Sequence, residues 1–521
     1  MPIARKSEPE SPIQSGSIAH PVISFSTCHT SLKEIGASME PLKRTPLVEG
    51  NMGARELLSV NGLVVNRGAR KVLDGVDFSV REGEVVALVG ENGCGKTTLL
   101  ESMAGLHSLS KGVVTRFDGG NESVVRDFDG NRGDILGFGL TLQSDGICGE
   151  ETVRERIITA IRISGHSPED SVIDEMLSDW GLGHRASDNV SQLSGGLRRR
   201  VAVLSGLAPA VMRADPTVVL LDEPSEGLDK ASRELLAGWI RSLSSLGHSI
   251  VIATHDYEMI SVADSVVSFE SNGSLSISPG ESLGNASKIP SPTTMVDVSR
   301  FSEFINWAWR MEKRNPIDTI GRATPALVAM LLAFTFATDI VRSTENYDLI
   351  AALVLAPAFI TAVAAPALLK RLSEERVGDW WRAMTGSWSR ATFSVVGASF
   401  ILPIPILYLS WFVIAGDIDS STNDQVLKWL WLPALSIIDV SAAAAALHLM
   451  VSDLRRASAA AGSLLLLVLV WPFLELTSAL ATIMESGMSF ELAIGEPLSD
   501  ILISSFSAVL VWGVAVIIPD E

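Results

Sequence analysis

The chain has few cysteines and no excess of positive charge. Its 521 residues include 3 cysteines, and the formal net charge is −19 at pH 7. Because Cys28, Cys94 and Cys148 are few and odd in number, we expect no disulfide framework, and a reduced cytosolic setting for the soluble part. The acidic balance argues against a nucleic-acid-binding surface, so we expect no nucleic-acid partner.

The first 54 residues lack a sustained hydrophobic period. They are rich in proline, serine and glycine, and they contain no apolar core of the kind that a secretory signal needs. Such a composition buries too little apolar surface to offset the entropy of ordering. We therefore expect residues 1–54 to form a disordered tail.

The most informative stretch is the octapeptide from Gly90 to Thr97, which matches the pattern G-x-x-x-x-G-K-[ST]. A run that predicts a buried strand precedes it, and a helix-forming run follows it. Together they point backbone N–H groups at an anion. We therefore predict nucleotide binding, with Lys96 at the β/γ-phosphates and the Thr97 hydroxyl on Mg²⁺. The predicted nucleotide-binding residues of this loop are Gly90, Asn92, Gly93, Gly95, Lys96, Thr97 and Thr98.

Residues 55–270 alternate strand-like and helical runs, which predicts an α/β domain. Within it, the apolar run 218–221 leads directly to Asp222 and Glu223. We expect Asp222 to organise Mg²⁺ and Glu223 to polarise the attacking water. An apolar strand that ends in acids is common, so this pattern alone leaves a purely structural role open.

Two further motifs fit a nucleotide site. The turn Ser194, Gly195 and Gly196 stands before three arginines and a helical run, and such a helix N-terminus binds anions. An ordinary helix cap has the same composition. His255 follows the apolar strand 250–252, where a structural histidine is the alternative to a catalytic one.

In their order these motifs resemble the ATP-binding-cassette (ABC) ATPases, over nearly all of residues 56–270. The resemblance implies an α/β P-loop NTPase fold with a helical subdomain, the cofactors ATP and Mg²⁺, and a homodimer with ATP between the two cassettes. It also implies roles for particular residues. These are catalysis for Glu223, His255 and Gln143, metal binding for Thr97, Gln143 and Asp222, and completion of the partner's ATP site for Ser194, Gly195, Gly196 and Asp229.

Two positions depart from the pattern of that family. The signature ends in Leu197, where the family usually has glutamine, and we expect this to alter packing more than chemistry. The aromatic residue that normally stacks on adenine is missing near Asn66. We expect Arg67 to replace it, because a guanidinium plane can lie on a ring.

The composition changes beyond a Ser/Gly/Pro-rich linker at 271–297. The mean hydropathy of the whole chain, +0.30, averages a charged N-terminal half and an apolar C-terminal part. We predict that residues 298–521 form an all-α membrane domain in the lipid bilayer, because their apolar runs are long enough to cross it. The six predicted spans lie at about 324–342, 349–369, 391–415, 429–451, 457–482 and 498–518.

Lysine and arginine are unevenly distributed among the loops that join these spans. The loop 370–390 is basic, and so is the pair Arg455 and Arg456, whereas the alternate loops are mainly acidic. The positive-inside rule therefore predicts a multi-pass protein of the plasma membrane. The nucleotide domain and both termini would lie in the cytoplasm.

Two segments beside the spans are amphipathic. Residues 301–310 carry aromatics on one side and fit a helix that lies along the membrane, with a buried soluble helix as the alternative. The charged and aromatic segment 371–381 suits a helix that docks near Gln143 and couples the two halves. An interfacial tryptophan belt is the alternative.

A cassette followed by six spans resembles the ABC-2-type exporters. Residues 301–521 more narrowly resemble the haem-exporter membrane subunit of cytochrome c maturation. We therefore expect an ATP-driven exporter whose substrate is unidentified, with haem as one candidate. The alternatives are an ABC-2 exporter of a lipid, drug or polysaccharide, and a mechanotransducer that moves no solute, which the short outer loops disfavour.

Polar residues inside apolar spans are costly and therefore mark functional candidates. By this argument Asp439 and Glu475 would line a polar path or bond to a neighbouring helix. A position near the edge of a span is the alternative. For His448 we expect a packing or hydrogen-bonding role rather than haem ligation.

Overall fold

The computed structural model describes most of the chain beyond residue 54. The described residues are 55–133, 138–270, 275–291, 299–343, 346–364, 366–386, 390–399, 402–414, 426–453, 468–486 and 496–517. The predicted tail, residues 1–54, lies outside them.

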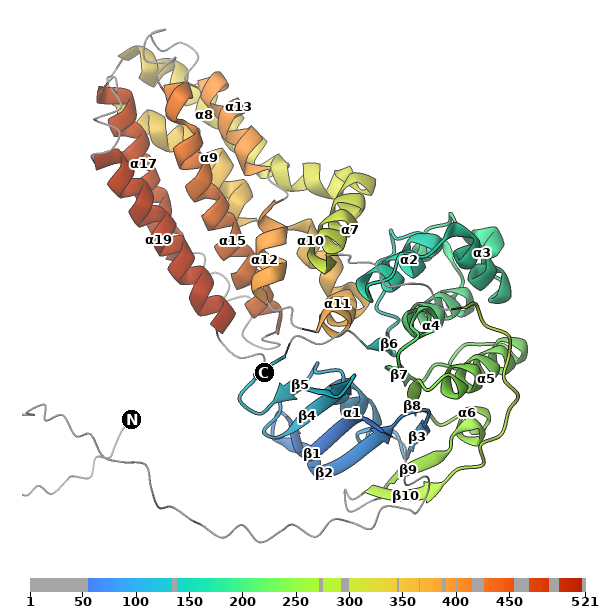
Figure 1. Cartoon of the computed structure of the whole chain (residues 1–521). Helices are drawn as coiled ribbons and strands as arrows, with labels where there is room; N and C mark the ends of the chain where they lie inside the picture. The colour runs from blue at the N-terminus through green and yellow to red at the C-terminus, as the bar shows by residue number, and fades with distance from the viewer. Residues whose placement is uncertain are drawn as a thin grey trace, which may run out of the picture. The chain divides into compact units, whose positions relative to one another are not determined.

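The N-terminal α/β region, residues 55–291, contains two β-sheets (Figure 1). The first is an antiparallel sheet in the order β2-β1-β4-β5, and the second is a mainly parallel sheet in the order β10-β9-β3-β8-β7-β6. The strands of the first sheet are β1 (Glu56–Arg67), β2 (Arg70–Arg81), β4 (Lys111–Asp118) and β5 (Asn121–Asp127). Those of the second are β3 (Val85–Val89), β6 (Gly139–Thr141), β7 (Val218–Asp222), β8 (Ser249–Ala253), β9 (Ser265–Phe269) and β10 (Leu275–Pro279).

Continuous apolar runs make the parallel strands. Every residue of β7 and β8 is buried, as expected where helices cover a sheet on both faces. Two short 3₁₀ turns, Gly183–Arg185 and Val190–Gln192, also belong to this region. Its helices are α1 (Lys96–Met103), α2 (Val153–Ile163), α3 (Asp170–Asp179), α4 (Gly195–Met212), α5 (Lys230–Ser245) and α6 (Tyr257–Val262). The predicted P-loop NTPase fold is confirmed for this region.

Part of the predicted linker is bound to the α/β region rather than free. Residues 275–279 form β10, which pairs antiparallel with β9. The chain then runs along α5, where the Ser242 hydroxyl donates to the Ser287 carbonyl oxygen. A side chain at Gly238 would collide with Ser287, because its Cβ would lie 1.9 Å from the Ser287 Oγ. Serine and glycine thus serve close packing here, which their composition alone did not reveal.

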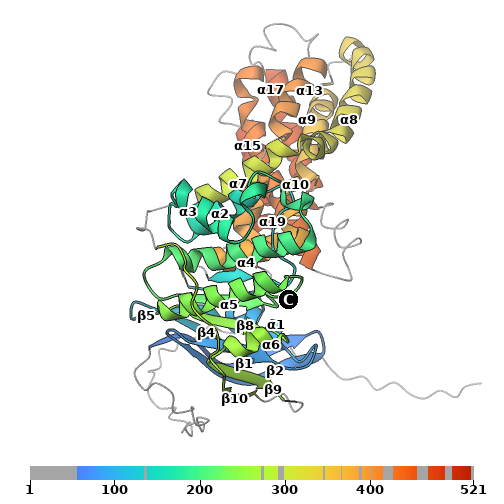
Figure 2. The same ribbon diagram turned by 90° about the vertical axis from the view of Figure 1, so that its right-hand side faces the viewer.

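The C-terminal helical region, residues 299–517, is built from helices alone among its described residues. Helices α9, α13, α15 and α17 run side by side (Figures 1 and 2). A 3₁₀ turn, Glu374–Arg376, stands between α10 and α11. The helices are α7 (Arg300–Arg314), α8 (Pro316–Ser343), α9 (Tyr347–Val363), α10 (Ala367–Ser373), α11 (Val377–Thr385), α12 (Arg390–Ser399), α13 (Pro403–Ile414), α15 (Trp431–Asp453), α17 (Val470–Ser486) and α19 (Glu496–Ile517).

Among the described residues, five stretches are long and apolar enough to cross a membrane. They are Pro316–Thr335, Tyr347–Thr385, Ala391–Ile414, Trp431–Val451 and Pro497–Ile517. The fifth predicted span, 457–482, begins in residues that are not described and ends within α17. The helical, apolar character of this region agrees with the sequence, while the count of six spans stays a prediction.

Candidate nucleotide site

The phosphate-loop pattern forms a loop between β3 and α1. Gly93 and Gly95 have φ values of 80° and 120°, which only glycine adopts readily, so the loop can turn its backbone toward a ligand. Lys96 opens α1, and its ammonium donates to the carbonyl oxygens of Gly90 at 2.7 Å and Glu91 at 3.1 Å. Thr98 is buried behind the loop. The predicted phosphate-binding residues therefore lie together.

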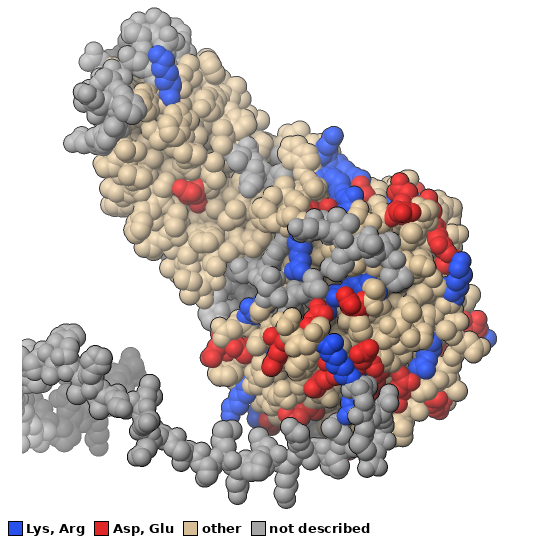
Figure 3. Space-filling view, viewed as in Figure 1, with Lys and Arg blue, Asp and Glu red and all other residues tan. Residues whose placement is uncertain are grey.

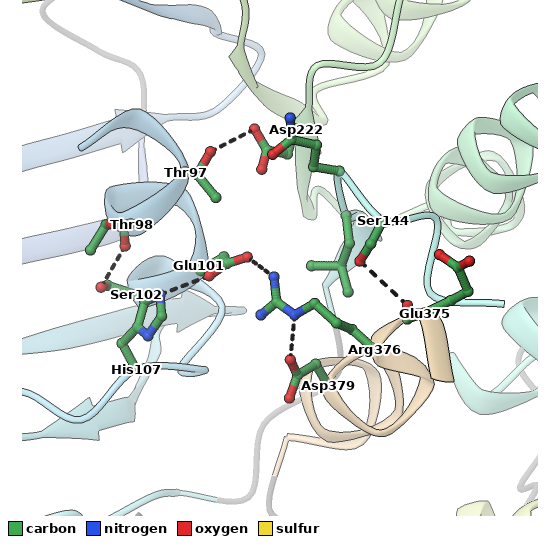
Figure 4. Close-up of polar contacts among 12 residues, drawn as sticks. Thr97, Thr98, Glu101, Ser102, His107, Ser144, Asp222, Glu375, Arg376 and Asp379 are labelled. Atoms are coloured by element: carbon green, nitrogen blue, oxygen red, sulfur yellow. Dashed lines mark hydrogen bonds and ion pairs between the residues drawn. The ribbon is translucent and has the colours of Figure 1, made fainter. Parts of the chain in front are cut away.

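The predicted metal site fits a cation. The Thr97 hydroxyl donates to the Asp222 Oδ1 at 3.2 Å, and the two side chains point toward one another in Figure 4. The other carboxylate oxygen of Asp222 is buried and has no hydrogen-bond partner in the described part of the chain. Burial raises the pKa of Asp222 to about 6, and the nearby carboxylates Glu101 and Glu223 act in the same direction. A hard cation bound by oxygen ligands would relieve that penalty.

Gln143, the third predicted metal residue, follows β6. Its side chain is exposed, and its carbonyl oxygen accepts from Arg199 at 3.5 Å. The structure thus puts the Gln143 backbone beside the strand end that carries Asp222. Its role as a metal ligand stays a prediction.

Two of the three predicted catalytic residues, Glu223 and His255, lie together after β7 and β8. The Nδ1 of His255 lies 3.0 Å from the Glu223 carboxylate. This hydrogen bond raises the pKa of His255 above its ordinary value. Glu223 itself has a left-handed φ of 45°, and its N–H donates to the Ala253 carbonyl oxygen at 2.8 Å. The constrained backbone holds the carboxylate at the edge of the sheet.

Arg199 is a positioning residue whose role does not follow from the sequence, where it is one of three arginines in a row. Its buried guanidinium donates to the carbonyl oxygens of Leu142 at 2.8 Å, Asp222 at 2.6 Å and Glu223 at 2.8 Å. It also pairs with the Asp145 carboxylate at 2.9 Å. One side chain of α4 therefore fixes the loop after Gln143 against the two acids at the end of β7.

The predicted partner-facing residues cap two helices. Ser194 is the N-cap of α4 and accepts from the Leu197 N–H at 3.5 Å, while Gly195 opens the helix. Asp229 is the N-cap of α5 and pairs with Arg200 at 2.9 Å. A Cβ at Gly196 would lie 3.0 Å from the Gly227 carbonyl oxygen, so the start of α4 touches the loop before α5 within one chain. Ser194 and Gly195 are exposed.

Arg67 lies beside the helix that follows the phosphate loop. Its guanidinium is 3.1 Å from the His107 Nε2 and 3.6 Å from the buried Glu101 carboxylate on α1. More than half of the Arg67 side chain is exposed. If Arg67 stacks on adenine as predicted, the same guanidinium must also serve the ion pair with Glu101.

Comparison with known proteins agrees with this geometry. Residues 73–226 match the family model for the ABC transporter. Over 233 residues the chain is 35% identical to the aliphatic sulfonates import ATP-binding protein SsuB 2 of Paraburkholderia xenovorans, covering 44% of this chain and 80% of that protein. It is 32% identical to the lipoprotein-releasing system ATP-binding protein LolD of Bacteroides fragilis, over 40% of this chain and 96% of that protein. This chain belongs to the ABC transporter family.

Two further comparisons differ in what they cover. The macrolide export ATP-binding/permease protein MacB of Azoarcus sp. is 34% identical over 44% of this chain and 34% of that protein. A solved ATP-binding subunit of an ABC transporter aligns with this chain at 24% identity and a TM-score of 0.37. The alignment covers 43% of this chain and 90% of the solved chain. Residues 55–291 are called the cassette from here on, and they carry the ATPase domain of this ABC transporter.

The segment 371–381 of this ABC transporter docks on the cassette beside Gln143, as predicted. The Glu375 carbonyl oxygen accepts from the Gly146 N–H at 3.1 Å and the Ser144 hydroxyl at 3.4 Å. Trp380 is fully buried, with the Arg156 guanidinium 3.4 Å from the centroid of its ring. Since protein covers Trp380, it is not part of an exposed tryptophan belt.

Helix α7 is only partly the surface helix that the sequence predicted. Phe304 and Trp307 are fully buried, and the Trp307 indole donates to the Glu151 carboxylate beside α2. Phe301, Ile305 and Trp309 are exposed and recur every four residues along one side of α7. The helix therefore packs one aromatic face against α11, α12 and the cassette, and leaves the other face open.

The polar candidates of the helical region have mixed surroundings. Asp439 is half-buried and hydrogen-bonded to Ser505, and Glu475 is also half-buried. The Nε2 of His448 lies 3.1 Å from the Val363 carbonyl oxygen, which agrees with the expected hydrogen-bonding role. Functional roles for Asp439 and Glu475 stay predictions.

Proposed function

We propose that this ABC transporter is an exporter in the plasma membrane, working as a homodimer that couples ATP hydrolysis to movement of its C-terminal helices. The observation that carries the proposal is the docked turn at Glu375. Its carbonyl oxygen is bound by the loop that directly follows Gln143. Arg199 ties that same loop to the end of β7. A shift at the nucleotide site thus has a short mechanical route to α11.

Two observations support the homodimer. Ser194 and Gly195 present the exposed N-terminus of α4, and such an end binds anions. Within the described part of one chain, the hydrogen bond from the Leu197 N–H is the only one that the Ser194 hydroxyl makes. In the proposed dimer these residues, with Asp229, close the partner's ATP site over Lys96, Thr97 and Mg²⁺.

Export is the proposed direction, with the cassette and both termini in the cytoplasm. The relatives named above include proteins of import, export and lipoprotein release, so direction rests on the resemblance of the helical region to ABC-2 exporters. Haem is one candidate substrate, and a lipid, drug or polysaccharide is the alternative. Staining for c-type haem in a deletion strain separates them, since normal staining would exclude haem export for cytochrome c assembly.

The hydrolytic role is tested with Glu223→Gln in the full chain reconstituted in lipid vesicles. We expect ATP turnover to fall by about 100-fold or more, because the water loses its base. Binding of a fluorescent ATP analogue should persist. The matched control is Glu234→Gln, an exposed acid on α5 that pairs only loosely with Lys230, at 3.8 Å. Full turnover in Glu223→Gln would remove Glu223 from this role.

A further inference from the structure

A buried carboxylate connects the phosphate-loop helix to the docked segment. Glu101 lies on α1, four residues after Thr97 and therefore on the same face of the helix, and it is completely buried. One of its oxygens accepts from the Arg376 guanidinium. The other lies 2.7 Å from the His107 Nε2. Figure 4 shows this carboxylate between His107 and Arg376.

The partners of Glu101 keep it ionised. Burial alone would raise the pKa of Glu101, but the hydrogen bonds from His107 and Arg376 lower it below the ordinary value. An anion buried in the cassette thus has its nearest cation, Arg376, in the C-terminal helical region, while Arg67 of the cassette lies farther away, at 3.6 Å. Loss of Arg376 would leave a buried charge without its closest compensation.

The turn that carries Arg376 is strained and held in place. Glu375 and Arg376 have left-handed φ values of 48° and 61°, which non-glycine residues rarely adopt in succession. The Arg376 Nε donates to the Asp379 carboxylate at 2.6 Å, and the Glu375 carbonyl oxygen is bound by the cassette. These bonds aim the guanidinium away from α11 and into the cassette.

We propose that Arg376 and Glu101 form the ionic link through which the position of α11 acts on the phosphate-loop helix, which makes Arg376 a positioning residue for ATP hydrolysis. This inference rests on the proposed function. With α11 docked, Glu101 is compensated and α1 keeps Thr97 facing Asp222. When α11 moves away, Glu101 loses Arg376, so the hydrolytic geometry and the position of α11 depend on one another.

The test is a double-mutant cycle on the full chain in lipid vesicles, with Arg376→Gln, Glu101→Gln and both changes together. Each single variant should lower kcat by about fivefold to tenfold, while the KM for ATP stays within about twofold. The double variant should be no slower than the slower single variant. Arg376→Lys should restore part of the rate, because it keeps the charge.

Lys370→Gln is the matched control, since Lys370 is an exposed cation on the neighbouring helix α10. It should change kcat by less than about twofold. Multiplicative losses in the double variant, or a normal kcat in Arg376→Gln, would overturn the link. Failure of the proposed function gives a different result. In that case the wild type shows no ATP turnover, or its turnover does not fall in Glu223→Gln.

If the wild type does not turn over ATP, the thermal midpoints of the same four proteins are compared without nucleotide. The link predicts that each single variant lowers the midpoint and that the double variant lowers it by clearly less than the sum of the two. Independent, additive reductions would overturn it. This readout needs no ATP turnover, so it separates the link from hydrolysis and transport.

Discussion

The cassette and the C-terminal helical region expose opposite kinds of side chain. In the cassette, strands such as β7 and β8 are fully buried and mostly apolar, and charged groups lie on the outside (Figure 3). On α19 the large apolar side chains face outward, and Phe506 is 69% exposed. The interior beside α19 is apolar as well, and it also contains the buried pair Ser436 and Ser504, whose hydroxyl oxygens lie 2.7 Å apart. Figure 3 shows a largely uncharged surface over this part of the chain.

This difference in exposed side chains fits water around the cassette and lipid around the C-terminal helices. In water, apolar surface is buried and charge is exposed. In a bilayer, apolar surface faces lipid at no cost, and small or hydroxyl-bearing residues let helices pack closely. Buried alanines from Ala443 to Ala446 on α15 fit this pattern. The exposure pattern therefore supports a membrane location for this region more directly than hydropathy does.

Removing a buried cation from the cassette should give the largest effect on stability. Arg199→Ala leaves Asp145 and four carbonyl oxygens without their buried donor, so we expect the free energy of unfolding of the cassette to fall by about 3–5 kcal/mol. Arg200→Ala is the control, because Arg200 is partly exposed and pairs with Asp229 alone among carboxylates in the described structure. It should cost under about 1 kcal/mol. Urea unfolding of the full chain in detergent measures both, and equal losses would contradict the role of Arg199.

An acid placed on an exposed apolar residue should affect the two regions differently. Phe506→Asp, near the middle of α19, should make membrane insertion less favourable by about 2.5–3.5 kcal/mol. Leu246 is an exposed apolar residue of the cassette, and Leu246→Asp should change the free energy of unfolding by no more than about 0.5 kcal/mol. Glycosylation-based insertion assays and thermal unfolding measure the two effects. If Phe506→Asp inserts normally, the exposed face of α19 does not face lipid.

A change of pH should weaken the cassette through a buried histidine. Burial and the nearby Arg213 lower the pKa of His248 to about 4, whereas an unfolded histidine titrates near 6.5. Because the folded pKa is depressed, this stabilisation is present above pH 6.5 and is lost as the pH falls toward 4. Between pH 7 and pH 5 we expect a loss of about 2 kcal/mol.

His248→Gln should flatten that pH dependence, since glutamine keeps an acceptor for the Thr217 N–H and does not titrate. His184→Gln, at an exposed histidine of the same cassette, should leave the dependence unchanged. Thermal midpoints between pH 5 and pH 7 make the comparison. An unchanged slope in His248→Gln would show that other groups cause the acid sensitivity.

Much of the nucleotide site was predictable because its chemistry is local. A glycine loop, a strand that ends in two acids and a histidine after the next strand each carry their signal within a few residues. Parallel pairing of β3, β7 and β8 then brings their ends to one edge of the sheet. The role of Arg199 was not predictable, since its partners lie 23 to 57 residues away in the chain.

Helix α7 and the linker show why other predictions needed correction. The sequence of an aromatic face is the same whether it contacts lipid or protein, so the burial of Phe304 and Trp307 against α11, α12 and the cassette was not foreseeable. Serine and glycine in residues 275–291 likewise favour free chain by composition, yet backbone pairing of β10 with β9 orders them. The aromatic partners of α7 lie far along the chain, whereas β10 pairs with the strand directly before it.

The cassette fold, the residues around the phosphate loop and the apolar character of the C-terminal helices follow from the sequence, because propensity, period and motif spacing act over short distances. The contacts of Arg376 with Glu101 and of Glu375 with Gly146 depend on tertiary packing, since they join residues more than 200 positions apart. A charged side chain can be recognised in the sequence, but its ion-pair partner depends on how the elements pack.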